Sequence, residues 1–439
     1  MFATHPSCFY YPEMQTTNYK SVKSEFDTIL RGLHNESKQT RECIEYSDFS
    51  HLCAGIYRTL NIFASGRDFI QHYQMKFGSS IDVGLFFDAL KSKRRTRYIK
   101  ELSQKLYDKF NKEAPSIFDP FLEHRELEGY EIYASDGHSH ASSDHEDPIA
   151  NKKRAPCNLF SLNLRTHYLR HMAICSPQNG KKKEHEITTL KRQDSNSLRM
   201  NNKMGVKVIH AYDPACIDYM FWDKSKKKYG VYFITLEKSN SALLEQGDFP
   251  FDDKDRRNNG VISNEMVGVN NGPQLRRITY MDPVTGRKFV FITNLHHKIP
   301  PGLIAYIYKC RWDIEKAFYE SKSQLKEVKS WGKTEEAKQQ QCCYIALVHN
   351  LMLFCERLVN IRELILDEKV LDKMEIRKTK EQIRSSKAGR EMNTLVSSSI
   401  RATNRSLQFI RWLRHQLDFS IPWKVAMEML APYMKHYIQ

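Results

Sequence analysis

The chain has 439 residues, of which 41% are hydrophobic and 27% are charged, and this composition excludes a disordered chain. One compact core rarely organises so many residues, so we expect two to four structural units. The formal net charge of +16, from 68 Lys and Arg against 52 Asp and Glu, favours a polyanionic partner.

The positive charges form separate clusters rather than one tail. The clusters are Lys91 to Arg97, Lys152 to Arg154, Lys181 to Lys183 and Lys224 to Lys228. Any one of them could be a solvated face instead of a contact surface, and the sequence leaves both interpretations open.

The cysteines and the apolar runs bear on the compartment. The ten cysteines contain no CxxC pair, which fits a reducing environment. The N-terminus lacks a basic start followed by an apolar run, so we expect no secretory signal. The longest apolar stretch, Tyr344 to Cys355, is short and contains His349 and Asn350, so we expect no membrane span.

Residues 1–125 show apolar residues three and four apart, a pattern that predicts a helical N-terminal region. The period then changes to two. The predicted strands are Tyr130 to Gly137, Asn158 to Leu164, His167 to Cys175, Val206 to Asp213 and Gly230 to Lys238. A short helix is expected from Glu184 to Arg192, and Pro214 suits the first position of another. Strands combined with such helices predict a mixed α/β sheet.

Residues 239–298 predict a β-rich insert. It begins with loop-forming residues and ends in a hairpin, in which RRITYM and RKFVFIT flank DPVTG. Arg277 alternates there with Ile278 and Tyr280, as in a strand with one buried face.

A helix is predicted from Leu303 to Val328, and a second one after Thr334, which suits an N-cap. On the first helix one stripe, within an arc of about 60°, contains Tyr308, Arg311, Glu315 and Lys322. An apolar stripe beside it should anchor the helix to a core. For the helix alone, the simpler interpretation is an exposed ion pair between Arg311 and Glu315.

The spacing of these four residues resembles the Y-R-E-K signature of the insertion sequence four family of bacterial transposases. The segments FVFITN before the helix, YxxRWxIE within it and WGKTEEAKQQQCCYIALVHNLML after it are also similar to the family, in family order. The resemblance covers Tyr130 to about Leu358. It implies a ribonuclease H-like core in two parts, residues 126–238 and 299–365, with a helical C-terminal region at 366–439.

The resemblance also implies a catalytic and metal-binding triad of Asp136, Asp213 and Glu315. Asp136 follows Ile132 and Ala134 on one face of its strand, and Asp213 follows Ile209 and Ala211 in the same way. Three carboxylates suit two Mg²⁺ ions, which Mn²⁺ can replace, in phosphoryl transfer. Pro214 departs from the family pattern, so Asp213 is the least certain ligand; Asp218 and Asp223 compete with it.

By the same resemblance Tyr308, Arg311 and Lys322 hold DNA phosphates. The implied function is cut-and-paste transposition by a homodimer on terminal inverted repeats and target DNA, in a bacterial cytoplasm at the nucleoid. A transposase-derived DNA-binding protein without cleavage activity is the alternative.

A rival site lies in DGHSHASSDHED, where His138, His140, Asp144 and His145 could form a zinc hydrolase centre. A solvated loop after the strand is the other interpretation of this segment.

Overall fold

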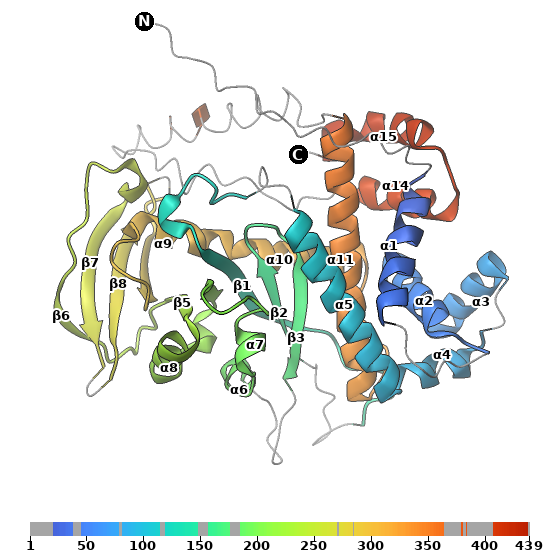
Figure 1. Ribbon diagram of the computed structural model, residues 1–439, viewed down its shortest axis with the longest axis horizontal. Coiled ribbons are helices and arrows are strands. Elements are labelled where there is room, and N and C mark those ends of the chain that lie inside the picture. The colour runs from blue at the N-terminus through green and yellow to red at the C-terminus, as the bar shows by residue number, and fades with distance from the viewer. Residues whose placement is uncertain are drawn as a thin grey trace, which may run out of the picture.

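A mixed sheet of nine strands forms the centre of the molecule (Figure 1). The computed structural model describes residues 21–37, 45–78, 81–114, 119–147, 157–175, 185–269, 272–283, 285–363, 379–380, 383 and 407–437. The strands lie in the order β3-β2-β1-β4-β5-β9-β8-β7-β6. Their bounds are β1 Tyr130–Ser139, β2 Cys157–Asn163, β3 Leu169–Cys175, β4 Lys207–Tyr212, β5 Val231–Leu236, β6 Leu244–Asp248, β7 Val261–Gly268, β8 Gln274–Met281 and β9 Lys288–Thr293.

The parallel strands lie in the middle of this sheet. β1 pairs with β4 and β4 with β5 in parallel, and all other neighbours are antiparallel. The predicted α/β class, a ribonuclease H-like mixed sheet with flanking helices and helical terminal regions, is confirmed. The β-rich segment extends the same sheet, because β9 pairs with β5. The predicted hairpin forms, with Met281 opposite Lys288.

Alternation along the strands decides which helices cover which face. One face carries the fully buried side chains of Ile132, Ala134, Ile209 and Ala211. These pack in one cluster with α9 (Pro301–Cys310) and α10 (Trp312–Tyr319). The opposite face packs against Leu190, Leu198 and Trp222. Those residues come from α6 (Glu186–Lys191), α7 (Ser195–Leu198) and α8 (Tyr219–Tyr229).

The N-terminal helices stand beyond β3, where α5 and α11 run side by side (Figure 1). Their bounds are α1 Val22–Ser37, α2 Asp48–Leu60, α3 Gly66–Phe77, α4 Val83–Leu90, α5 Lys93–Glu113 and α11 Glu335–Glu363. The side chains of Ser47, Ser65, Asp82 and Ser92 cap α2 to α5. Each cap accepts a hydrogen bond from a backbone N–H of the first turn, which explains where these helices begin.

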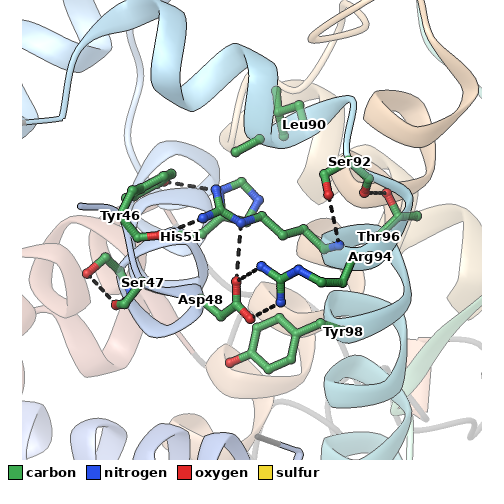
Figure 2. A network of polar contacts seen from close by, with 12 residues as sticks. Tyr46, Ser47, Asp48, His51, Leu90, Ser92, Arg94, Thr96 and Tyr98 are labelled. Atoms are coloured by element: carbon green, nitrogen blue, oxygen red, sulfur yellow. Dashed lines mark hydrogen bonds and ion pairs between the residues drawn. The ribbon is translucent and has the colours of Figure 1, made fainter. Parts of the chain in front are cut away.

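A buried polar network joins the N-terminal helices to α11 (Figure 2). His51 lies 3.0 Å from the Tyr46 hydroxyl and 2.7 Å from Oε1 of Gln340 on α11. The Gln340 amide in turn donates to the Leu90 carbonyl and the Thr96 hydroxyl, at 3.0 Å each. Unsatisfied buried polar groups are costly, so these contacts fix how the N-terminal helices sit on α11.

Two of the predicted basic residues belong to the same network. Arg94 donates two hydrogen bonds to the Asp48 carboxylate, and Arg95 donates one at 3.2 Å. Asp48 and Arg95 are both buried. Part of the Lys91 to Arg97 cluster is therefore structural. The clusters Lys152 to Arg154 and Lys181 to Lys183 lie outside the described residues.

Helix α11 is the longest helix of the described chain, and by length and composition its segment Glu335–Val359 could cross a membrane. The structure instead buries 83% of the most apolar window of this segment. Asn350 pairs with both backbone groups of Leu169 on β3, at 2.7 and 2.9 Å. As predicted, Thr334 accepts a hydrogen bond from the backbone of Ala337 at the start of the helix.

Of the C-terminal helices, α14 (Leu407–Asp418) lies beside α1, and α15 (Trp423–Tyr437) packs against α14 (Figure 1). The Trp412 indole donates to the Ala426 carbonyl at 2.8 Å and so ties the two helices together. Most of the predicted C-terminal region between 366 and 406 falls outside the described residues.

Candidate active site

Asp136 and Asp213 emerge side by side from neighbouring parallel strands. Asp136 lies within β1, and Asp213 directly follows β4. The register pairs Ser135 with Tyr212, so the next residue on each strand is one of the two aspartates. Both share the face of the buried Ile and Ala pairs, as the alternation predicted. This face is the one covered by α9 and α10.

The local turn after β4 fixes Asp213. Its Oδ1 accepts the backbone N–H of Ala215 at 2.8 Å, and Pro214 opens a short 3-10 helix (Pro214–Cys216). The competing acids are engaged elsewhere. Asp218 caps α8 through the Phe221 N–H at 2.9 Å and forms an ion pair with Lys191, and Asp223 pairs with Lys227 at 2.7 Å.

Arg311 connects the strand end to the opposite helix. Its Nη1 donates to Oδ2 of Asp136 at 2.9 Å, and its Nη2 donates to Oε1 of Glu315 at 2.8 Å. The guanidinium is buried, with 6% of the side chain exposed. The predicted i, i+4 pair with Glu315 therefore exists, but it is half of a bridge that brings Glu315 to Asp136. The simple exposed ion pair is excluded.

The charges around Asp136 are out of balance. Burial raises the pKa of Asp136 to about 6, although Arg311 and the Gly137 N–H act to lower it. The negative charges of Glu186 and Asp213 raise it further. Arg311 is bonded to two carboxylates, and Asp213 and Glu186 add further negative charge, so the site holds more carboxylates than arginines, a condition that favours binding of a cation.

Tyr308 lies behind this pair on α9. It is buried in the cluster that includes the sheet face, and its ring centroid is 5.4 Å from Cζ of Arg311. Burial raises the pKa of Tyr308 to about 12; Arg311 opposes the rise, whereas Asp213 and Asp136 add to it. Tyr308 therefore stays protonated and supports Arg311.

The helix predicted from Leu303 to Val328 is interrupted twice. Arg311 separates α9 from α10, and a π-helical turn, Glu320–Gln324, follows α10. The chain then leaves the helix at Lys326, whose φ is +61°. Buried Glu320 contacts Nδ1 of His349 on α11 at 3.1 Å, a long-range contact that no helical period reveals. The prediction of one continuous helix was wrong.

This π-helical turn carries Lys322, and single π-turns are frequent at functional sites. Lys322 acts electrostatically on His138 and His140 at the end of β1. Burial, then the neighbouring His140 and Lys322, lower the pKa of His138 to about 2, so both imidazoles are neutral.

The rival zinc site does not assemble. His138 and His140 are buried, with ring centroids 4.7 Å apart, and His138 stacks on Phe318 of α10. Asp144 is exposed and pairs with Lys329, and His145 is exposed. The solvated-loop interpretation is confirmed for Asp144 and His145 and was wrong for His138 and His140, which are buried beside the carboxylates.

Glu186 was not predicted as a site residue. Its Oε1 lies against Gly137, where an added Cβ would be only 2.0 Å away. The thiols of Cys216 and Cys157 lie 3.6 and 3.8 Å from its carboxylate oxygens. The glycine after Asp136 was the one hint that another group approaches there. Glu186 is a fourth carboxylate beside the two aspartates.

The carboxylates fit a hard divalent cation in donor type and in charge. All are oxygen donors, and their summed negative charge is larger than the single positive charge of Arg311. Within the described residues, no group of three His, Cys, Asp or Glu encloses a metal position. Arg311 is the cationic group bonded to both Asp136 and Glu315.

Comparison with known families gives one match. Residues 217–351 match the family described as "Transposase DDE domain". No curated protein matches the chain. The matched segment includes Tyr308, Arg311, Glu315 and Lys322, and it begins after both aspartates. The match supports a transposase function for the chain.

Proposed function

We propose that this chain is a DDE transposase of the insertion sequence four type, which cleaves the ends of its element and joins them to target DNA. The match to a transposase DDE domain supports the class of enzyme. The observation that carries the catalytic assignment is the meeting of Asp136 and Asp213 at adjacent strand ends, with Glu315 linked to Asp136 through Arg311.

In this proposal Asp136, Asp213 and Glu315 would hold the divalent metal, Mg²⁺ or Mn²⁺. Bound there, two such ions would stabilise the attacking and leaving oxygens of in-line displacement at phosphorus. For the metal to bind, Arg311 would have to break its hydrogen bond to at least one of the two carboxylates. The guanidinium would then be available to hold a DNA phosphate. Tyr308, packed against Arg311, keeps that guanidinium at the site.

The remaining residues of the stripe would bind the DNA. Lys322, half-buried on the π-helical turn, supplies a point charge for a backbone phosphate. Trp312 and Tyr319 of α10 are 57% and 64% exposed, one on each side of Glu315 in sequence, and could contact bases or sugars. The face around Glu315 therefore combines charge with aromatic surface.

The proposal extends to the whole protein. The helical N-terminal region would contribute to DNA binding, and α14 and α15 would contribute to pairing of two copies, since two element ends must be joined. A homodimer acting on terminal inverted repeats in a bacterial cytoplasm fits this scheme.

The test compares Glu315→Ala, Lys322→Ala and the exposed control Glu245→Ala on β6, using a supercoiled plasmid that carries the element's own ends. Mg²⁺-dependent cleavage should be lost in Glu315→Ala while end binding stays within about threefold, because a metal ligand is removed and no phosphate contact. Lys322→Ala should weaken binding and cleavage together. Glu245→Ala should match the wild type.

Two outcomes would contradict the assignment. Equal loss of DNA binding in the Glu315 and Lys322 variants would make Glu315 a structural partner of Arg311. A wild-type protein that binds the ends but never cleaves them would establish the alternative, a DNA-binding protein derived from a transposase.

A further inference from the structure

A second cationic surface lies at the end of the sheet opposite the carboxylates. Lys207 is the first residue of β4, whose far end leads to Asp213. At about 3.3 Å per residue, the six residues of this strand separate the two ends by about 20 Å. Lys226, at the end of α8, and the segment His296–Lys298, which follows β9, belong to the same end of the sheet.

Backbone contacts hold these residues together. Nζ of Lys226 donates to the Asn294 carbonyl at 2.7 Å, two residues before His296. The rings of His296 and His297 are 4.1 Å apart, and the Lys298 N–H lies 3.2 Å from Nδ1 of His296. The lysine of α8 and the basic loop after β9 therefore form one surface.

Aromatic rings are interleaved with the charges. Nζ of Lys207 is 5.0 Å from the ring centroid of Tyr130, and Nζ of Lys226 is 5.7 Å from that of Tyr232. The two tyrosine rings are 5.7 Å apart, so they bridge the two lysines. At the other side Phe249 stacks on His297 at 5.4 Å. Cations alternating with rings are typical of nucleic-acid binding surfaces.

The positive charge of this surface is not neutralised. Across the described residues, Lys207, Lys226 and Lys298 form no ion pair within 4.0 Å. Asp223, the acid that acts on Lys226, is bonded to Lys227 instead. Partial burial and the neighbouring charges, beginning with His297 and Lys298, lower the pKa of His296. Uncompensated charge of one sign attracts a polyanion.

We propose that this basic–aromatic surface, formed by Lys207, Lys226, His296, His297, Lys298 and Tyr232, binds the phosphate backbone of duplex DNA away from the cleaved phosphate. The inference deepens the proposed transposase function and rests on it for the identity of the nucleic acid. A distance of about 20 Å corresponds to roughly six base pairs at 3.4 Å each. Lysines act as point charges on phosphates, so the contact is independent of base sequence.

The test measures binding without catalysis. Lys207→Glu/Lys298→Glu is compared with wild type and with the matched double variant Lys238→Glu/Lys288→Glu, whose exposed lysines follow β5 and begin β9. Fluorescence anisotropy in EDTA follows a 40-base-pair duplex over a range of salt. Affinity should fall at least about tenfold relative to the matched control, and the log–log salt slope should shrink by about 2, because two phosphate contacts are lost.

Equal affinity and slope in the two double variants would overturn the proposal, as would tighter binding of duplex RNA than of duplex DNA by the wild type. Lys207→Gln/Lys298→Gln repeats the measurement should the charge reversals fail to fold, with a smaller but still specific loss expected. Because binding is read in EDTA, failure of the cleavage assay would count against the proposed catalysis and leave this result standing.

Discussion

Two carboxylates of this molecule are bonded to arginines, but their pKa values shift in opposite directions. At Asp48 on α2 two arginines, Arg94 and Arg95, serve one buried carboxylate, and their hydrogen bonds and charges outweigh burial so that the pKa of Asp48 is lowered (Figure 2). At Asp136 one arginine, Arg311, is shared with Glu315, and the pKa is raised to about 6.

The difference separates a structural ion pair from a site prepared for a ligand. The Asp48 group is neutralised within the protein, so it has nothing left to bind and contributes to the packing of α2 on α5 and α11. The group at Asp136 retains negative charge that a cation from outside would stabilise. The ratio of arginines to carboxylates, more than burial itself, distinguishes the two.

The largest expected effect is a loss of cleavage, which should distinguish Asp213 from the two other acids that follow β4. Asp213→Asn should reduce Mg²⁺-dependent cleavage by at least about 10³-fold, because a carboxylate at the strand end is lost. Asp218→Asn and Asp223→Asn should remain near wild type, since Asp218 caps α8 and pairs with Lys191 of α6, and Asp223 pairs with Lys227 within α8. Cleavage of an end-containing plasmid measures all three. An active Asp213→Asn enzyme would move the ligand to one of the other two.

In the free energy of unfolding, substitution at Asp48 should have a destabilising effect, and substitution at Asp136 should not. Asp48→Asn leaves Arg94 and Arg95 without a counter-charge and should lower the free energy of unfolding by about 3 kcal/mol. Asp136→Asn removes a carboxylate in excess, and Arg311 keeps Glu315, so the variant should lose no stability and should gain on the order of 1–3 kcal/mol at neutral pH. Urea unfolding in EDTA at neutral pH makes the comparison. Equal losses would show that Asp136 is structural as well.

The pH dependence of stability should also differ in sign. The pKa of Asp136 in the folded protein, about 6, exceeds its ordinary value of 3.8. The stability that Asp136 contributes to the folded protein is therefore fully present below pH 3.8. It is lost as the pH rises through 6, and the loss is on the order of 1–3 kcal/mol. Asp48 has a lowered pKa, so its contribution is present above pH 3.8 and is lost on further acidification.

Metal-free unfolding at a series of pH values, for wild type and Asp136→Asn, isolates the first of these contributions. The advantage of the Asn variant should grow between pH 4 and pH 8. A difference that stays constant over this range would mean that the pKa of Asp136 is not raised in the folded protein.

The smallest expected effect concerns Glu186. Glu186→Gln removes one of the charges that raise the pKa of Asp136, so the pKa should fall by less than about one unit. In the Glu186→Gln background, the pH at which Asp136→Asn becomes more stable than the protein with Asp136 should be lower by the same amount. Glu428→Gln serves as the control. An unshifted curve would place Glu186 outside the electrostatic environment of Asp136.

Local periodicity was sufficient to predict the two strands that lead to Asp136 and Asp213 and the face on which each aspartate lies, whereas their role as metal ligands followed only from the family resemblance. Ile132 and Ala134 in one strand, and Ile209 and Ala211 in the other, fix which face is buried and therefore which way the following aspartate points. The hairpin at Asp282 and the cap at Thr334 were predictable for the same reason, since each depends on a few neighbouring residues.

What the sequence did not reveal depends on contacts between distant segments. The π-helical turn after α10 accompanies the contact of Glu320 with His349, and the burial of His138 accompanies its stacking on Phe318. Glu186 reaches the site because α6 folds back against Gly137. The role of Arg95 as a buried partner of Asp48, rather than as a DNA contact, could not be read from a run of basic residues.

The position of α11 also constrains how the chain can be made. His51 and its partner Gln340 are 289 residues apart. At about 5–20 residues per second, a ribosome needs roughly 15 to 60 seconds to synthesise the intervening chain. During that interval the N-terminal helices have no α11 to pack against, and the buried faces of α2 and α5 remain uncovered. Nascent chains of this protein should therefore depend on chaperones until α11 emerges.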